Sequence, residues 1–116
     1  MREKYIKNLN KNYDFSKNGF NVILPKIDSD EVSICFVDVA EERDNYCMLD
    51  KSTIFYYIID GNGEFEIEND FISVVKNDLI EILPKQKYSY KGNLRMLEIQ
   101  SNPFDENEVH EYKKYN

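Results

Sequence analysis

The side chains best suited to chemistry in this sequence are tyrosines. The chain contains nine tyrosines, two cysteines and a single histidine, His110, which lies in a charged C-terminal segment where we expect it to be solvated. A phenol, with a pKa of about 10, can donate a proton or stack on a sugar ring, whereas general-base catalysis at neutral pH needs a tuned carboxylate or imidazole. These residue types favour ligand binding over acid–base catalysis.

Two of the tyrosines are expected to meet inside the fold. Side chains alternate between the two faces of an extended strand, so Tyr56 shares a face with Ile54 and Ile58. By the same alternation Tyr88 shares a face with Tyr90. We therefore expect Tyr56 and Tyr88 to line one interior, where their hydroxyls would either edge a pocket or be satisfied locally in a packed core.

Acid–base catalysis would need a carboxylate beside these phenols, and Asp50 and Glu81 are the nearby candidates. If the protein is an enzyme, we expect Tyr88, Asp50 and Glu81 to be its catalytic residues. Cys47 is a poor candidate nucleophile, because no histidine is at hand to activate its thiolate. The sequence contains neither a phosphate-binding loop nor a G-x-S-x-G nucleophile motif.

The elements that must position these residues are β-strands. The chain has one alanine against 12 isoleucines, 7 valines, 9 tyrosines and 7 phenylalanines, and β-branched and aromatic side chains suit a pleated surface. Apolar runs recur about every ten residues between turn-forming residues, a pattern typical of a sandwich or barrel. We predict an all-β fold with strands at Asn21–Leu24, Glu31–Val39, Tyr46–Leu49, Ile54–Ile59, Glu64–Glu68, Phe71–Val75, Leu79–Leu83, Tyr88–Tyr90 and Leu94–Gln100.

The segment 60–63, Asp-Gly-Asn-Gly, is the most distinctive local signal in the sequence. Glycine and asparagine tolerate the positive φ angles of a tight turn, so we predict a hairpin here between the strands 54–59 and 64–68. In the second of these strands three glutamates alternate with Phe65 and Ile67, which predicts one face toward water and one toward a core.

Length and charge limit the class of protein. At 116 residues we expect a single domain, with residues 1–18 and 105–116 as peripheral arms, although Asp105–Glu108 could cap one helical turn. The formal charge of −7 argues against a nucleic-acid partner, because such binding depends on clustered Lys and Arg. Two cysteines are too few for a disulfide framework, and no apolar run is long enough for a membrane span or signal peptide. These features predict a cytoplasmic protein.

The strand at Ile54–Ile59 is apolar on both faces. In an antiparallel sheet the core covers one face, so the other must be covered by a second layer or a second subunit. We therefore predict a homodimer.

From about residue 35 to residue 108 the sequence resembles a small single-domain cupin, a jelly-roll β-barrel. Gly61 matches the closing glycine of the first cupin motif, with an aromatic-aliphatic strand before it. The resemblance implies that the family's four metal ligands, three His and one Glu, correspond here to Cys47, Leu49, Ile54 and Tyr88, or to Met48 and Asp50 in place of the first two if the shorter motif spacing applies.

These replacements predict a cupin-like protein without metal or other cofactor, because a divalent metal wants three or four N, O or S ligands. We expect the barrel to bind a small polar, sugar-like molecule. The resemblance also leaves open an isomerase or epimerase acting on a nucleotide sugar, and a structural or regulatory subunit whose barrel is filled. The expected binding residues are Tyr56, Phe65, Tyr88, Tyr90, Met96 and Cys47.

Overall fold

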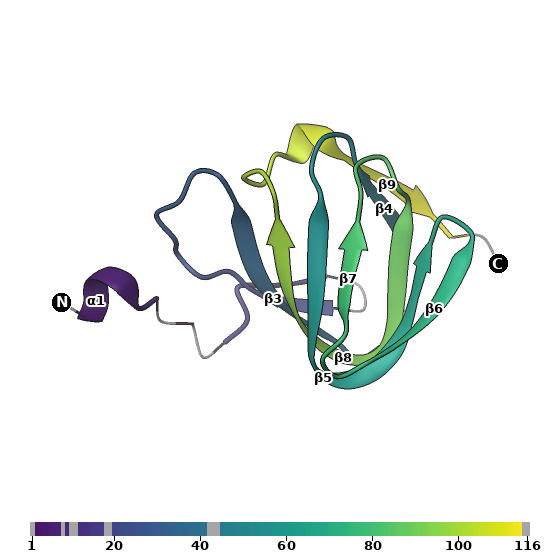
Figure 1. Ribbon diagram of the computed structural model, residues 1–116, viewed down its shortest axis with the longest axis horizontal. Helices are drawn as coiled ribbons and strands as arrows, with labels where there is room; N and C mark the ends of the chain where they lie inside the picture. The colour runs from purple at the N-terminus through teal and green to yellow at the C-terminus, as the bar shows by residue number, and fades with distance from the viewer. Residues whose placement is uncertain (1, 8, 10–11, 18–19, 42–44, 115–116) are drawn as a thin grey trace.

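The computed structural model describes residues 2–7, 9, 12–17, 20–41 and 45–114, and it confirms the expected all-β architecture (Figure 1). One short α-helix and one 3-10 turn accompany the strands of the described residues. In chain order the elements are α1 (Arg2–Tyr5), β1 (Phe15–Lys17), β2 (Phe20–Ile23), β3 (Ser33–Val39), β4 (Asn45–Leu49), β5 (Ile54–Ile67), β6 (Asp70–Val75), β7 (Leu79–Ile82), β8 (Tyr88–Gln100), η1 (Glu106–Glu108) and β9 (Val109–Lys113).

The strands form one antiparallel sheet that curls into two facing walls. The first wall contains β1, β2, β3, the C-terminal half of β8, the N-terminal half of β5 and β7. The second wall contains β6, the C-terminal half of β5, the N-terminal half of β8, β4 and β9. The two long strands, β5 and β8, therefore belong to both walls and join them.

The predicted hairpin at residues 60–63 is wrong, because these residues lie inside β5, a single strand of 14 residues. The chain reverses instead at Glu68 and Asn69, between β5 and β6. At residues 58–60 the β5–β8 register shifts by a bulge, and Gly61 has a φ of +93°. The glycine-rich segment thus bends a long strand at the corner of the barrel rather than ending it.

Glycines on both strands allow this bend. Gly63 and Gly92 are register partners, and Gly92 has a φ of +119°. A Cβ on Gly92 would lie 2.6 Å from the Gly63 Cα and 2.7 Å from the Asn62 carbonyl oxygen. The two backbones therefore approach more closely here than any side chain would permit.

The core lies between the walls and follows the alternation of the strands. Ile54, Tyr56 and Ile58 on β5 are at most 2% exposed, whereas the residues between them are half-buried on the outer face. Phe65 and Met96 are fully buried. The predicted alternation after residue 64 is confirmed, since Phe65 faces the core and the flanking glutamates do not.

The C-terminal segment, expected to be peripheral, is part of the barrel. Asp105 caps η1 by accepting a hydrogen bond from the Asn107 N–H at 3.0 Å, and β9 then pairs with β4 along five residues. The turn is anchored by Glu108, which is 3% exposed. Its carboxylate accepts hydrogen bonds from the backbone N–H groups of Lys51 and Ser52 at 3.0 and 2.9 Å and from the Ser52 hydroxyl at 2.9 Å.

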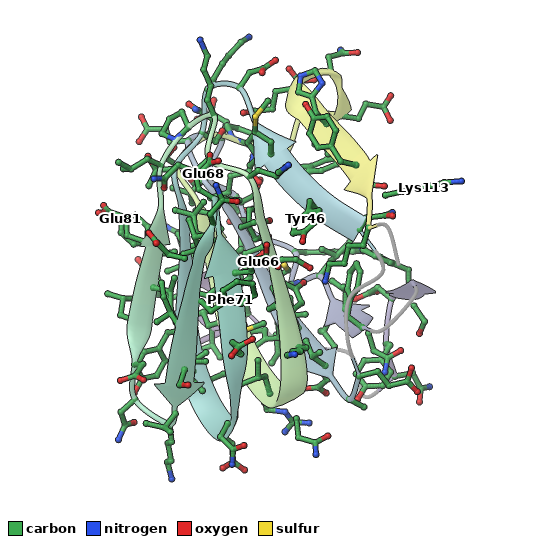
Figure 2. The ribbon with its side chains drawn as sticks, turned by 90° about the vertical axis from the view of Figure 1, so that its right-hand side faces the viewer. Tyr46, Glu66, Glu68, Phe71, Glu81 and Lys113 are labelled. Carbon is green, nitrogen blue, oxygen red and sulfur yellow. The ribbon has the colours of Figure 1, made fainter. Side chains whose placement is uncertain are left out.

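Strand β4 pairs with β8 at one position, Cys47 opposite Tyr88, so side chains help to hold it in the second wall. The Tyr46 hydroxyl lies 2.9 Å from both carboxylate oxygens of Glu66 on β5, and Figure 2 shows these two side chains next to each other. The Ser89 hydroxyl donates to the Asn45 carbonyl at 3.1 Å. Neither helical element of the described chain is long and apolar enough to cross a membrane.

Candidate functional site

A cavity of about 330 Å³ lies between the two walls. The first wall supplies most of its lining, and β4, β8 and β9 supply the rest. The surface is mainly aromatic and aliphatic, with a few polar groups. Its polar or titratable lining residues are Ser33, Cys35, Cys47, Tyr56, Tyr88, Tyr90, Glu98, Gln100 and Glu111.

Two tyrosine hydroxyls meet inside this cavity. Tyr56 comes from the half of β5 in the first wall, and Tyr88 from the half of β8 in the second. Their Oη atoms are 3.0 Å apart, so one hydroxyl donates to the other. Both residues are nearly fully buried, at 1% and 3% exposure. The pair places two hydroxyl groups within the aromatic part of the cavity surface.

An aromatic cluster surrounds this pair. The Tyr56 ring centroid lies 5.3 Å from that of Phe65 and 5.6 Å from that of Tyr90. Tyr90 in turn contacts Phe20 of β2 edge-on, with ring centroids 6.4 Å apart. These tilted and edge-on contacts are favourable ring geometries, and they fix the orientation of Tyr56.

A carboxylate and a thiol lie on the same inner surface. Cys35, Glu98 and Tyr56 are register partners across β3, β8 and β5, so they form one row across the first wall. The Cys35 thiol donates to Glu98 Oε2 at 3.4 Å. Burial, together with the negative charge of Glu98, raises the pKa of the Cys35 thiol far above its ordinary value. The thiol therefore stays protonated at neutral pH and is not a nucleophile.

Four of the six expected binding residues line the cavity: Tyr56, Tyr88, Tyr90 and Cys47. Phe65 and Met96 do not line it, although both face the interior. They lie toward the bend between β5 and β8, where the walls converge and side chains fill the space. Phe65 and Met96 therefore pack in the core beneath the cavity and do not form its surface.

The two expected catalytic carboxylates are not in the cavity lining. Glu81 lies on β7 between the buried Ile80 and Ile82, so alternation turns it to the outer face, where Figure 2 shows it projecting away from the barrel. Asp50 instead lies beside His110, with Asp50 Oδ2 and His110 Nε2 separated by 2.9 Å.

His110 does not line the cavity either. Its neighbours on β9, Val109 and Glu111, face the interior, so His110 points to the opposite side of the strand. The contact with Asp50 means that this histidine is not simply solvated, as the sequence had led us to expect.

The most important residue missed by the sequence reasoning is Glu98. The strand 94–100 was predicted, and Glu98 shares a face with the buried Leu94 and Met96. Its parity alone could therefore have placed it inside the barrel. Gln100 lines the cavity by the same parity. Glu111 also lines it, but from β9, a strand that the sequence did not lead us to expect.

The residues at the family's metal-ligand positions do not suit a metal ion. Cys47 and Tyr88 face the cavity, but Leu49 and Ile54, which line it beside them, offer only carbon atoms. Asp50, the possible third donor, lies against His110. Among the described residues no group of three or more His, Cys, Asp and Glu side chains could hold a metal ion.

The hairpin of β1 and β2 forms one side of the cavity, through Phe15, Phe20 and Val22. Its preceding segment is tied to β3, because the Tyr13 hydroxyl donates to Asp38 Oδ2 at 2.6 Å. Arg95 donates to both oxygens of the same carboxylate, from Nε at 2.8 Å and from Nη2 at 3.0 Å.

Comparison with solved structures identifies the class of fold. A histidine-to-glutamine variant of Streptomyces Pac13 with uridine matches with a TM-score of 0.88 and 19% identity, covering 97% of this chain and 93% of that one. KdgF from Halomonas sp. matches at 0.69 and 9%, covering 92% and 94%, and the cupin domain of Schizosaccharomyces pombe Cnp3 at 0.65 and 10%, covering 86% and 71%. This chain therefore has the cupin-type jelly-roll fold.

Pac13 itself, a nucleoside dehydratase, matches with a TM-score of 0.83 and 18% identity, covering 95% of this chain and 88% of its own. Two tyrosine-to-phenylalanine variants of Pac13 with uridine give the same score at 17% identity. No family model matches this sequence, and no curated protein sequence matches it.

Proposed function

We propose that this protein binds a small polar ring compound, a nucleoside or a sugar-like molecule, inside the barrel. The observation that carries the proposal is the Tyr56–Tyr88 hydroxyl pair, set in the aromatic wall of a cavity of about 330 Å³. Small-molecule sites are mostly apolar pockets of about 300–1,000 Å³ with a few convergent polar groups. Rings pack against the aromatic wall, and hydroxyls reach the tyrosine pair.

The structural neighbours support a nucleoside as the first ligand to test, since three of the Pac13 structures contain uridine. The free space supports a binding role over a barrel filled by its own side chains.

A second candidate is an enzyme of the isomerase, epimerase or dehydratase type. The observation that favours it is that a carboxylate, Glu98, and the Tyr56–Tyr88 phenols line one cavity. A base and an acid in one pocket are what proton transfer to and from a sugar carbon requires. In this candidate mechanism Glu98 has the role of the catalytic carboxylate, for which we had expected Asp50 or Glu81.

A thermal-shift screen of the wild-type protein against uridine, the other nucleosides, nucleotide sugars and free sugars tests the proposal. A ligand that binds only the folded state stabilises it by about 2.7 kcal/mol at a concentration one hundred times its Kd, so a binding nucleoside raises the Tm. Incubation of the same ligands with the protein, followed by chromatography, detects turnover. A flat Tm across the whole panel contradicts the proposal.

We also propose that the protein is a homodimer. The supporting observation is an apolar patch on the outer face of the first wall, here named the outer patch. By strand alternation and register it consists of Ile23, Phe36, Phe55, Tyr57, Leu79, Leu97 and Ile99. A contiguous patch of this kind marks an interaction surface. The two free cysteines fit a reducing compartment such as the cytoplasm.

A further inference from the structure

Glu98 is a carboxylate whose hydrogen-bonding capacity the protein itself hardly uses. It lies half-buried in the middle of the first wall, between Cys35 and Tyr56 in the cross-strand row, and it lines the cavity. In the described part of the chain its one hydrogen bond is the 3.4 Å contact from the Cys35 thiol to Oε2, and no cation forms an ion pair with it.

This arrangement leaves acceptor positions open toward the cavity. An ionised carboxylate has about four lone-pair positions, and a thiol is a weak donor that satisfies one of them poorly. A charge beside an apolar surface is costly unless donors reach it. No buried side-chain N or O atom of the described residues lacks a hydrogen-bond partner, so Glu98 Oε1, which has none there, is an accessible acceptor on a residue that lines the cavity. The donors that would complete Glu98 must therefore come from the cavity's contents.

We propose that Glu98 selects the ligand by accepting hydrogen bonds from two adjacent hydroxyls, an inference that rests on the proposed function. The site would then take a ring that bears a vicinal diol. A carboxylate presents two oxygens in one plane, which matches the two neighbouring donors of a ribose or a similar sugar. The aromatic wall around Tyr90 packs against the rest of the molecule. A ribonucleoside therefore fits the site better than the corresponding dideoxynucleoside.

The first test uses the wild-type protein alone. Calorimetric titration with uridine, 2′-deoxyuridine, 3′-deoxyuridine and 2′,3′-dideoxyuridine measures the contribution of each hydroxyl. We expect the Kd to rise with each hydroxyl removed, by tenfold or more for the dideoxy compound, because hydrogen bonds to a charged group are the stronger kind. Equal affinity for uridine and dideoxyuridine would overturn the inference while leaving ligand binding intact.

The second test compares Glu98→Gln with Glu81→Gln, the same chemical change on the outer face of β7. We expect Glu98→Gln to weaken uridine binding about tenfold, leave dideoxyuridine binding unchanged and so abolish discrimination between the two. Glu81→Gln should behave as the wild type. Far-UV circular dichroism and the Tm establish that both variants are folded.

The outcomes separate the inference from the function on which it rests. The role of Glu98 alone is overturned if the wild type binds uridine and dideoxyuridine equally well. It is also overturned if Glu98→Gln still discriminates between them. Failure of the wild type to bind any nucleoside or sugar overturns both. If Glu98→Gln does not fold, the wild-type hydroxyl series still decides the question.

Discussion

At the residue scale, the Tyr56–Tyr88 pair and Glu98 differ in how far the protein itself satisfies their hydrogen bonds. Tyr56 and Tyr88 hydrogen-bond each other through their hydroxyls, whereas among the described residues Glu98 accepts a hydrogen bond only from the weak donor Cys35. A phenol pair that is already hydrogen-bonded can exchange that bond for one to a ligand at little net cost. Glu98 instead gains hydrogen-bond donors when a ligand binds. Substitutions in the tyrosine pair and at Glu98 are therefore expected to change ligand affinity differently.

Replacing Tyr88 with phenylalanine tests the tyrosine pair. We expect Tyr88→Phe to weaken ligand binding by about 0.5–1.5 kcal/mol, the net contribution of one hydrogen bond, with little change in the free energy of unfolding. If the protein is an enzyme and Tyr88 is its acid, the same change should abolish turnover and leave binding nearly intact.

Tyr57→Phe is the matched control, because the Tyr57 hydroxyl donates to Asn77 Oδ1 at 2.8 Å outside the barrel. It should not alter ligand affinity. A lower Tm in Tyr88→Phe with no ligand found in any screen would instead favour a purely structural role for Tyr88.

Glu108 illustrates a buried charge with a structural role. Its carboxylate accepts three hydrogen bonds from Lys51 and Ser52, and replacement by glutamine leaves one of these donors facing an amide N–H₂ group. We expect Glu108→Gln to lower the free energy of unfolding by about 1–3 kcal/mol, measured by urea denaturation. Glu106→Gln, exposed in the same turn, should change it by less than about 0.5 kcal/mol. Equal effects of the two variants would contradict this account.

At the element scale, the long strands β5 and β8 determine the shape of the site. Each strand runs along both walls, and the bend between its halves brings Tyr56 of one wall to Tyr88 of the other. The bend depends on glycine at positions where two backbones nearly touch. Changes here are expected to act on the whole barrel, although they lie outside the cavity.

Gly92→Ala tests the bend directly. The new Cβ would meet backbone atoms of Gly63 and Asn62, which cannot move aside as a flexible side chain can, and the positive φ adds strain. We expect a loss of about 1–3 kcal/mol in the free energy of unfolding. Asn93→Ala, an exposed neighbour on the same strand, should be nearly neutral. A Gly92→Ala variant as stable as the wild type would show that the corner tolerates a side chain.

The segment before β1 should detach from the barrel at low pH. The hydrogen bond from Arg95, with that from Tyr13, lowers the pKa of Asp38 below its ordinary value of 3.8. Because the folded-state pKa is lowered, the stabilisation that Asp38 gives to this segment is fully present above about pH 4. It is lost as the pH falls through the folded-state pKa. The protection of residues 12–17 against hydrogen exchange, taken relative to the intrinsic exchange rate at each pH, should therefore be present at pH 7 and fall in strong acid.

Asp38→Asn should produce the same loss of protection already at pH 7, because the charged acceptor of Tyr13 and Arg95 is gone. Asp60→Asn, an exposed carboxylate near the same surface, is the control. Unchanged exchange in Asp38→Asn would mean that other contacts hold this segment.

At the scale of the whole molecule, the first wall carries apolar side chains on both faces. Its inner face lines the cavity, and the outer patch crosses the same strands on the opposite side. A two-fold pairing through this patch would put the walls that carry the binding residues at the centre of the dimer. Ligand binding and self-association would then depend on the same sheet.

Sedimentation of the wild-type protein at micromolar concentration should show a dimer. Leu97→Lys, at the centre of the outer patch, should shift it to a monomer, because a two-fold interface would bury the new charge twice. Phe71→Lys is the matched control, since Phe71 is 66% exposed on β6 and lies outside the patch (Figure 2). A monomeric wild type, or a Leu97→Lys dimer, contradicts the proposed pairing.

The sequence by itself determined the fold class and the faces of the strands. The abundance of β-branched and aromatic residues and the alternation within each strand were enough to predict an all-β barrel with Tyr56 and Tyr88 inward, because strand parity is a local property. The residues that resemble cupin motifs led to the same barrel, which the solved structures confirm.

The tertiary structure decided which residues meet. Glycines at 61 and 63 suit a hairpin turn equally well as a strand bend, and only the pairing with β8 selects the bend. Strand parity turns Glu98 inward and Glu81 outward, but only the pairing of β8 with β3 and β5 places Cys35 and Tyr56 beside Glu98. Neighbours such as Cys35 and Glu98 are 63 residues apart in the chain, and no local pattern encodes their contact.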